Sequence, residues 1–276
     1  MSLRRFHQVD VFAGAPLGGN PVAVIVDAEG LSDQQMAATA RWTNLSETTF
    51  VLPPTDPAAD YRLRIFTPGG ELPFAGHPTL GSAFAWLSTV GDPGRDLIQE
   101  CGAGLVAVRF TQGRPAFAAP ALVRTGPVDE HALGRVAASL RIARSDILDH
   151  QWVDNGPGWL GVLLESGARV RALEPDFGAM GDLAVGVVGP QVHREETAFE
   201  VRAFAPGHGV DEDPVTGSLN AGLAQWLRGV GRAPATFVAA QGTAMGRSGR
   251  VHIHDDGENI WVGGSCVSRV IGTFDL

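Results

Sequence analysis

The sequence predicts two homologous halves, each of which combines β-strands with α-helices. The first observation is an internal repeat, in which YRLRIFTPGGELPFAGHPTLGSAFAWL (61–87) resembles FEVRAFAPGHGVDEDPVTGSLNAGLAQWL (199–227). Each copy has the pattern of a strand, a Pro-Gly turn, a glycine-rich loop and a helix. The second observation is that 36 glycines and 18 prolines are spread along the 276 residues, which is typical of many short strands joined by tight turns.

The repeat extends upstream of these two copies. VDVFAGAPLGGNPVAVIV (9–26) resembles VDNGPGWLGVLL (153–164) in the second half of the chain. We therefore place the first half at residues 1–122 and the second half at residues 123–262.

Local signals predict where helices begin and end. Ser32 and Gln35 form a capping box, in which each side chain satisfies a backbone N–H group of the other residue. Pro78 is expected at the first position of the helix in the first copy, because its fixed φ and missing N–H suit that position. Gly91 is expected to end this helix.

The composition excludes several classes of function. A formal net charge of -9 argues against a nucleic-acid-binding surface. All 21 basic residues are arginine, so the chain has no lysine amine for Schiff-base or pyridoxal phosphate chemistry. The sequence has neither a long apolar span nor the apolar segment of a signal peptide, so we expect a cytoplasmic protein with no membrane or nucleic-acid partner.

The cysteines and histidines do not predict a metal site. Cys101 and Cys266 lie far apart and lack zinc-binding spacing, so we expect two buried thiols. His252 and His254 lie on one face of a predicted strand, but the sequence shows no third ligand near them. We therefore expect neither a metal nor a cofactor.

A duplicated chain is expected to hold its functional site between the two halves, because a cleft between domains excludes water and keeps an entrance. The glycine-rich loops with Gly76 and Gly217 would bring two helix N-termini to that cleft. Backbone N–H groups at helix N-termini favour an anionic ligand or a developing negative charge. The alternative is that these glycines only allow each helix to pack closely on a strand.

The two halves differ in the acids that they carry. Glu47 aligns with apolar residues of the second half, and Asp213 aligns with apolar residues of the first half. Two such acids can give and take a proton in a site poor in water. His77 and Ser218 occupy equivalent positions at the two helix starts. No cation adjoins Glu47 in the sequence, so we expect its pKa to be raised in a closed site.

Each of these side chains also has a structural interpretation. Glu47 could be an ordinary surface acid. Asp213 could cap the helix that follows it, since DPVTGS is a favourable sequence for a helix start. His77 could be a buried hydrogen-bonding group that never changes its protonation state.

Four motifs, at compatible spacing, resemble the phenazine-biosynthesis isomerase family, the PhzF-like proteins, and the similarity spans nearly the whole chain. The resemblance implies an α+β fold of the duplicated, two-domain diaminopimelate epimerase-like type, in which each half is a barrel-like sheet around a central helix. It also implies a cofactor-independent, often homodimeric enzyme whose C-terminal strand (263–276) can return to the first half. The motifs are GNPVAV (19–24), NLSETTF (44–50), FTPGGELPFAGHPTLG (66–81) and DEDPVTGS (211–218).

The resemblance further implies roles for single residues. Glu47 corresponds to the general acid/base of the family, and His77 and Asp213 complete the predicted catalytic set. The residues expected to bind the substrate are Asn20, Gly76, Gly217 and Ser218.

Related diaminopimelate epimerases and proline racemases have a cysteine directly before each helix glycine, where this chain has Ala75 and Thr216. This difference argues against two-thiol racemisation. The implied reaction is removal of a C–H proton by Glu47 from a small cyclic unsaturated acid, such as a dihydro-hydroxyanthranilate, and return of a proton by Glu47 or Asp213 at a vinylogous carbon. A related epimerase, an isomerase of aliphatic acids and a non-catalytic small-acid-binding protein remain alternatives.

Overall fold

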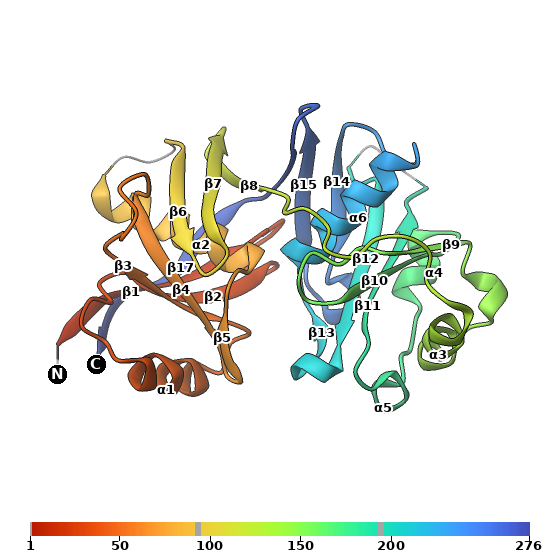
Figure 1. Ribbon diagram of the computed structural model, residues 1–276, viewed down its shortest axis with the longest axis horizontal. Helices are drawn as coiled ribbons and strands as arrows, with labels where there is room; N and C mark the ends of the chain where they lie inside the picture. Colours follow the sequence, from red (N-terminus) through yellow and green to blue (C-terminus); the bar gives the residue numbers. More distant parts are fainter. Residues whose placement is uncertain (1, 92–94, 193–195) are drawn as a thin grey trace. The chain divides into compact units, whose positions relative to one another are not determined.

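The computed structural model describes residues 2–91, 95–192 and 196–276. Its contacts divide the chain into two compact α+β units (Figure 1). The first unit consists of Met1–Ala118 together with Gly263–Leu276, and the second consists of Ala119–Val262.

The first unit wraps its strands around helix α2. Ten residues of this 15-residue helix are buried, and it contacts strands on several sides, namely β1, β2, β3, β4, β6, β8 and β17. The elements of this unit are β1 (Leu3–Val11), β2 (Asn20–Ile25), α1 (Asp33–Thr43), β3 (Thr48–Leu52), β4 (Tyr61–Thr67), β5 (Gly70–Leu72), α2 (Gly76–Val90), β6 (Leu97–Cys101), β7 (Gly104–Thr111), β8 (Arg114–Ala118) and β17 (Cys266–Asp275).

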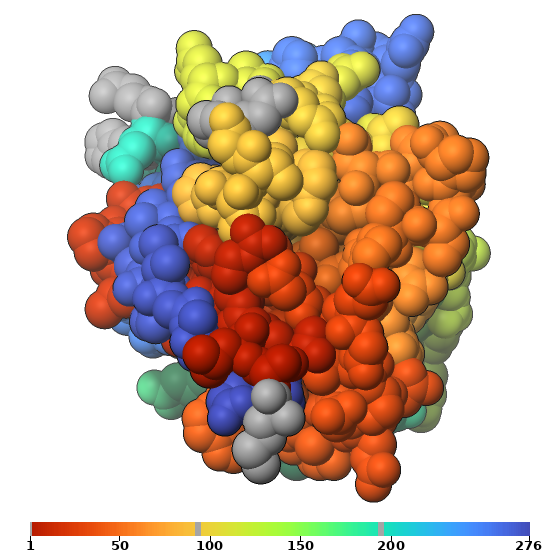
Figure 2. Space-filling model, turned by 90° about the vertical axis from the view of Figure 1, so that its left-hand side faces the viewer, coloured from red at the N-terminus to blue at the C-terminus, as the bar shows by residue number. Residues whose placement is uncertain are grey.

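The last strand of the chain belongs to the first unit. Strand β17 pairs antiparallel with β1, from Leu3 opposite Asp275 to Val11 opposite Cys266. Figure 2 shows the blue C-terminal strand alongside the red N-terminal strand on this unit. The pairing brings side chains from the two ends of the sequence into contact.

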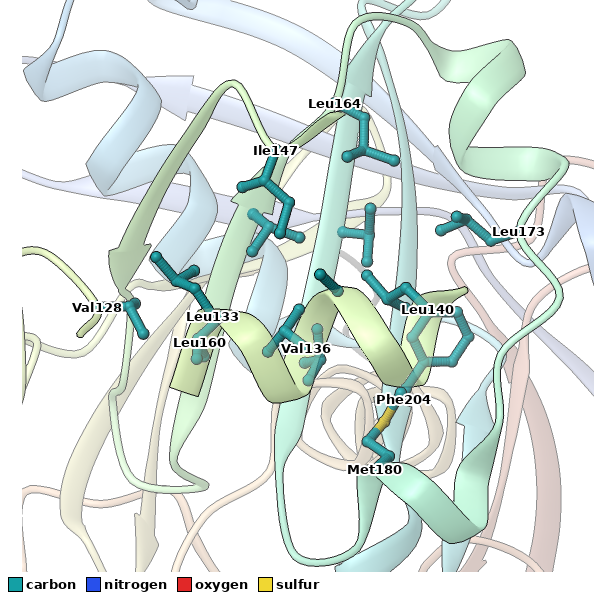
Figure 3. Close-up of a cluster of buried hydrophobic side chains, with 14 of the residues drawn as sticks. Val128, Leu133, Val136, Leu140, Ile147, Leu160, Leu164, Leu173, Met180 and Phe204 are labelled. Atoms are coloured by element: carbon teal, nitrogen blue, oxygen red, sulfur yellow. The ribbon is translucent and has the colours of Figure 1, made fainter. Parts of the chain in front are cut away.

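The second unit has its own set of elements and its own core. Figure 3 shows α3 lying against the sheet, with Leu133, Val136 and Leu140 directed toward the strands. The elements are α3 (Glu130–Leu140), β9 (Asp149–Trp152), β10 (Trp159–Leu163), α4 (Gly167–Arg171), α5 (Phe177–Met180), β11 (Ala184–Pro190), β12 (Phe199–Ala205), β13 (Val210–Asp213), α6 (Gly217–Gly229), β14 (Thr236–Gln241), β15 (Gly249–Asp255) and β16 (Ile260–Gly263), with 3-10 turns at Arg144–Asp146, Pro206–His208 and Thr243–Met245.

The two units share one strand topology. In the first unit, β1–β2 is antiparallel, β2–β3 parallel, β3–β4 and β4–β5 antiparallel, β4–β6 parallel and β6–β7 antiparallel. In the second unit, the series from β9 to β15 repeats these directions pair by pair. Helices α2 and α6 occupy the same place in the two series, so the repeat predicted from the sequence is a repeat of structure.

Side-chain contacts repeat together with the strands. In both units an arginine makes a bidentate ion pair with a glutamate. The nitrogen–oxygen distances are 2.6–2.7 Å in the first unit and 2.7–2.8 Å in the second. The guanidinium carbon lies 5.0 Å and 4.9 Å, respectively, from the centroid of a phenylalanine ring. The residues are Arg64, Glu71 and Phe66 in the first unit and Arg202, Glu212 and Phe204 in the second.

Two of the three helix signals have the predicted outcome. The capping box of Ser32 and Gln35 is present at the start of α1, and Gly91 ends α2 in the left-handed conformation. The position of Pro78 was predicted wrongly: α2 begins at Gly76, so the proline is the third helical residue. Proline is tolerated there because the N–H groups of the first turn have no partner within the helix.

Glycine allows each central helix to approach the sheet. A Cβ atom on Gly81 of α2 would lie 2.4 Å from Val22 Cγ1, and one on Gly222 of α6 would lie 2.3 Å from the carbonyl oxygen of Val153. Both distances are too short for a real contact. The contact at Gly222 is the more restrictive one, because a backbone carbonyl oxygen cannot rotate away as a side-chain methyl group can.

We expect Gly222→Ala to lower the free energy of unfolding by about 1–3 kcal/mol, because the added methyl group forces α6 away from Val153. Chemical denaturation of the whole chain measures this loss. The matched control is Gly134→Ala in α3, where a Cβ meets nothing within 4 Å; it should stabilise the protein by about 0.5–1 kcal/mol, because alanine is the better helix former. Equal effects of both changes would contradict the proposed close approach.

Candidate functional site

Glu47 lies at the end of the loop that joins α1 to β3. Helix α1 is followed by its C-cap residue Asn44, which adopts the left-handed conformation with φ 54°. The hydroxyl groups of Thr43 and Thr48 lie 2.6 Å apart and brace the loop. The backbone carbonyl of Glu47 accepts a hydrogen bond from Ala23 of β2. The neutral polar residues around Glu47 in the sequence therefore fix its backbone, and only 14% of its side chain is exposed.

His77 lies next to Glu47 in the first turn of α2. Its Nε2 atom is 3.2 Å from Glu47 Oε2, and its Nδ1 atom is 3.4 Å from the amide nitrogen of Asn20. The first unit thus brings together three of the predicted site residues, with Gly76 directly before His77. Asn20 is fully buried, and its side-chain amide contacts His77.

Burial decides the charge of His77. Removal from water lowers the pKa of His77 to about 3, and a hydrogen bond to the carbonyl of Pro21 opposes this shift only in part. The ring is therefore neutral at physiological pH, and its contact with Glu47 is not an ion pair despite the short distance. The unprotonated nitrogen of a neutral imidazole can accept a hydrogen bond from a carboxylic acid without adding a positive charge beside it.

The two central helices begin without a side-chain cap. In the described residues, α1, α3, α4 and α5 have a capping side chain at their N-termini, whereas α2, after Ala75, and α6, after Thr216, do not. Gly76 and Gly217 are the first residues of these helices, and both are buried. Backbone N–H groups of an uncapped first turn are suited to bind an anion.

Asp213 lies at the end of β13 in a hydrogen-bonded network of the second unit. Its Oδ2 atom accepts a hydrogen bond of 2.6 Å from the hydroxyl of Thr216. The fully buried Gln241 donates to the Asp213 carbonyl at 3.0 Å and to the Thr216 hydroxyl at 2.9 Å. Gln241 also accepts a hydrogen bond from the backbone N–H of Thr216. The N-cap residue of α6 is Thr216, and Asp213 binds its side chain.

Sequence reasoning did not find Gln241 or Thr216 as supports of Asp213. Gln241 opens the segment QGTAMGRSGRV (241–251), which lies outside the four motifs that carry the family resemblance. In the sequence, Thr216 is distinguished only by its position, where related epimerases have a cysteine. In the structure, its hydroxyl group donates to Asp213 and accepts a hydrogen bond from Gln241.

Ser218 lies in the first turn of α6 and is oriented by two neighbours. Its hydroxyl oxygen accepts a hydrogen bond of 3.0 Å from the indole N–H of Trp159, and its carbonyl oxygen accepts one of 2.9 Å from the side chain of Asn155. Because the hydroxyl oxygen is used as an acceptor, its proton is directed elsewhere and can serve as a donor.

The cysteines differ from their prediction in one respect. Both thiols are free, and Cys266 is buried, but Cys101 is only half-buried. Burial, together with the charge of Asp10, raises the pKa of Cys266, and burial also raises the pKa of Cys101. Raised pKa values make both thiols poor nucleophiles and poor bases. Neither lies at the start of α2 or α6.

Among the residues described, no helix combines the length and the apolar character needed to cross a membrane.

The chain matches the family model of phenazine biosynthesis-like proteins over residues 9–270, and it belongs to this family. It is 37% identical to a trans-2,3-dihydro-3-hydroxyanthranilate isomerase from Pseudomonas aeruginosa over 92% of this chain and 91% of the relative. It is 36% identical to a Schizosaccharomyces pombe protein named antisense-enhancing sequence 1 over 99% of both chains.

The fold is shared with solved structures of the same family. A phenazine biosynthesis protein from Enterococcus faecalis, of the PhzF family, superposes with a TM-score of 0.83 at 27% sequence identity, and the match covers 100% of both chains. The predicted α+β, diaminopimelate epimerase-like fold and the family resemblance are confirmed. The chain is an isomerase of this family.

The burial of His77 predicts a pH-dependent stability. Between about pH 6.5 and pH 3, the unfolded chain binds a proton at His77 that the folded chain does not bind. Lowering the pH through this range therefore destabilises the folded state by about 1.4 kcal/mol per pH unit on account of this group. In His77→Gln, this contribution should be absent, so the free energy of unfolding of the variant should fall less steeply than that of the wild type as the pH is lowered.

Chemical denaturation of both proteins at half-unit steps from pH 8 to pH 4.5 measures the difference. Above pH 7.5, the two curves of unfolding free energy should run parallel, which provides the internal control. Curves that stay parallel down to pH 4.5 would contradict this, because they would show that His77 is protonated as readily in the folded protein as in the unfolded chain.

Proposed function

We propose that the protein moves a proton, and with it a double bond, in a small cyclic unsaturated carboxylic acid similar to trans-2,3-dihydro-3-hydroxyanthranilate. Glu47 is the proposed general acid/base. The observation that carries the proposal is the largely buried carboxyl group of Glu47 at 3.2 Å from a neutral imidazole. The name of the Pseudomonas aeruginosa relative suggests the substrate class.

The neutral state of His77 suits the proposed role of Glu47. A protonated imidazole would favour the carboxylate form of its neighbour and weaken it as a base. A neutral ring has a single N–H group, which the hydrogen bond to the Pro21 carbonyl uses, so Nε2 can accept a hydrogen bond from Glu47 in its carboxylic acid form. Glu47 can then take up and release a proton without a permanent positive charge that favours one state.

The proposed reaction conserves atoms and electrons. The Glu47 carboxylate takes a proton from an acidic C–H group of the substrate, and the electron pair of that bond spreads over the conjugated system and its carboxyl group. Glu47, now a carboxylic acid, returns a proton to a vinylogous carbon, and the double bond moves. Asp213 is the second acid that we propose for a proton-transfer role. No electrons are exchanged with another molecule, so the step requires no redox cofactor.

The uncapped start of α2, at Gly76, is the proposed partner of the substrate's negative charge. The backbone N–H groups of a first helical turn, together with the helix dipole, stabilise a carboxylate or a delocalised anion. The corresponding start of α6, with Gly217 and the oriented hydroxyl of Ser218, offers the same kind of donors. We also propose, from the family resemblance, that the enzyme is a cytoplasmic homodimer.

Two-thiol epimerisation is the less favoured alternative. The residues directly before Gly76 and Gly217 are Ala75 and Thr216, neither of which can act as a thiolate base. The two cysteines of the chain have raised pKa values and lie elsewhere in the fold. A carboxylate-centred reaction uses groups that the chain has.

Proton NMR in D₂O tests the function and the base together. Wild type and Glu47→Gln are incubated with dihydroaromatic and cyclohexadiene carboxylates, including trans-2,3-dihydro-3-hydroxyanthranilate. We expect deuterium to enter a ring carbon with the wild type and the rate to fall by about 10²–10⁴-fold in the variant, because glutamine keeps the shape but cannot carry the proton.

Glu29→Gln is the matched control, since Glu29 is an exposed acid in the same unit, and it should exchange at the wild-type rate. Asp213→Asn tests the second acid in the same assay. Exchange that survives in Glu47→Gln would move the base to another residue. Binding of these acids by the wild type without any exchange would support a non-catalytic binding protein instead.

A further inference from the structure

We infer that the ion pair of Asp10 and Arg269 is a positioning element for the proposed base: it fixes the Gly19–Pro21 segment, which orients His77 beside Glu47. The inference rests on the proposed function as far as Glu47 is concerned. Its structural part, from Arg269 to His77, does not depend on the substrate.

Asp10 is a buried acid that the proposed reaction does not use. Only 4% of its side chain is exposed. Its Oδ1 atom accepts a hydrogen bond of 2.9 Å from the backbone N–H of Gly19. A buried carboxylate needs such donors, because removal from water costs several kcal/mol unless hydrogen bonds and an opposite charge offset it.

The opposite charge comes from the last strand of the chain. The Nε and Nη2 atoms of Arg269, on β17, each lie 3.4 Å from Asp10 Oδ2. Arg269 is partly exposed, with 28% of its side chain open to solvent. The pairing of β17 with β1 places Asp10 opposite Val267, two residues before Arg269. The two residues are separated by 259 positions in the sequence, so only the return of β17 brings them together.

Gly19 is the residue through which the pair of Asp10 and Arg269 holds the loop before strand β2. A Cβ atom on residue 19 would lie 2.1 Å from the Val11 carbonyl oxygen and 2.7 Å from Asp10 Oδ1. The absence of a side chain therefore lets the loop approach β1 closely enough for the hydrogen bond to Asp10. The next two residues, Asn20 and Pro21, start strand β2.

Asn20 and Pro21 hold the imidazole of His77. The Asn20 amide nitrogen is 3.4 Å from His77 Nδ1, and the Pro21 carbonyl oxygen forms a hydrogen bond with the ring. The opposite side of the ring faces Glu47 at 3.2 Å. A shift of the Gly19–Pro21 segment would therefore be transmitted to the orientation of His77 toward the proposed base.

The second unit contains a related arrangement of an aspartate, a glycine turn and an asparagine at the equivalent place. Asp154, which aligns with Asp10 in the sequence repeat, accepts hydrogen bonds of 2.7 Å from the N–H groups of Gly156 and Gly158. The turn that it holds carries Asn155, whose side-chain amide donates to the backbone carbonyl of Ser218, the counterpart of His77, at 2.9 Å. An aspartate that fixes a glycine turn and, through an asparagine, the start of the central helix is thus a repeated feature of the fold.

The experiment combines ¹⁵N NMR of histidine-labelled whole protein with the deuterium-exchange assay. We expect Arg269→Gln to shift the ring nitrogen signals of His77, identified by their loss in His77→Gln. We also expect it to lower the exchange rate on the order of tenfold with little change in KM, because small displacements of catalytic groups mainly affect kcat. Arg269→Lys, which restores the charge, should recover a large part of both effects.

Arg5→Gln is the matched control. It removes another arginine–aspartate pair of strand β1, that with Asp27, whose side chains are 52% and 45% exposed, and it should change neither readout. A folded Arg269→Gln protein whose His77 signals equal those of the wild type would overturn the inference. If the wild type exchanges no substrate, the proposed function fails, but the His77 signals still decide whether Arg269 positions the ring.

Asp10→Asn provides an independent second variant. Asparagine keeps an oxygen for the Gly19 N–H but removes the charge that pairs with Arg269, so we expect the same direction of change in the His77 signals. Should this buried substitution prevent folding, the partly exposed Arg269 variants carry the test alone.

Discussion

The structure depends on one constraint, which is the enclosure of a helix by strands in each of its two units. Helices α2 and α6 can approach the strands only because Gly81 and Gly222 leave no side chain at the contact. The enclosure buries the first turns of both helices. Groups that usually lie in water, such as the imidazole of His77 and the hydroxyl of Thr216, must therefore find their partners within the protein.

The chemistry of the candidate site follows from this burial. His77 loses its charge, because the cost of burying an imidazolium outweighs its hydrogen bonds. Glu47 then lies beside a polar but uncharged neighbour. In the second unit, Asp213 is held by the hydroxyl of Thr216 and the side-chain amide of Gln241. Each unit thus presents an acid next to the uncapped start of a buried helix.

The sequence predicted the features that rest on local signals or on repetition. The duplicated α+β fold, the family and the capping box at Ser32 are confirmed. The contact of Glu47 with His77 fits their common assignment to one site, but the roles of both residues stay predictions. Gln241 and the pair of Asp10 with Arg269 could not be predicted, because strands distant in sequence bring these residues to their partners, and no periodicity or spacing records such contacts.

The central claim is that a neutral, buried His77 supports Glu47 as the proton-carrying group. A ¹⁵N NMR titration of the histidine-labelled wild type from pH 8 to pH 4.5 tests it most directly. We expect the two ring nitrogens of His77 to keep the distinct signals of one N–H and one unprotonated nitrogen throughout, because its pKa is about 3. A transition to the imidazolium near pH 6.5, its ordinary pKa, would contradict the account.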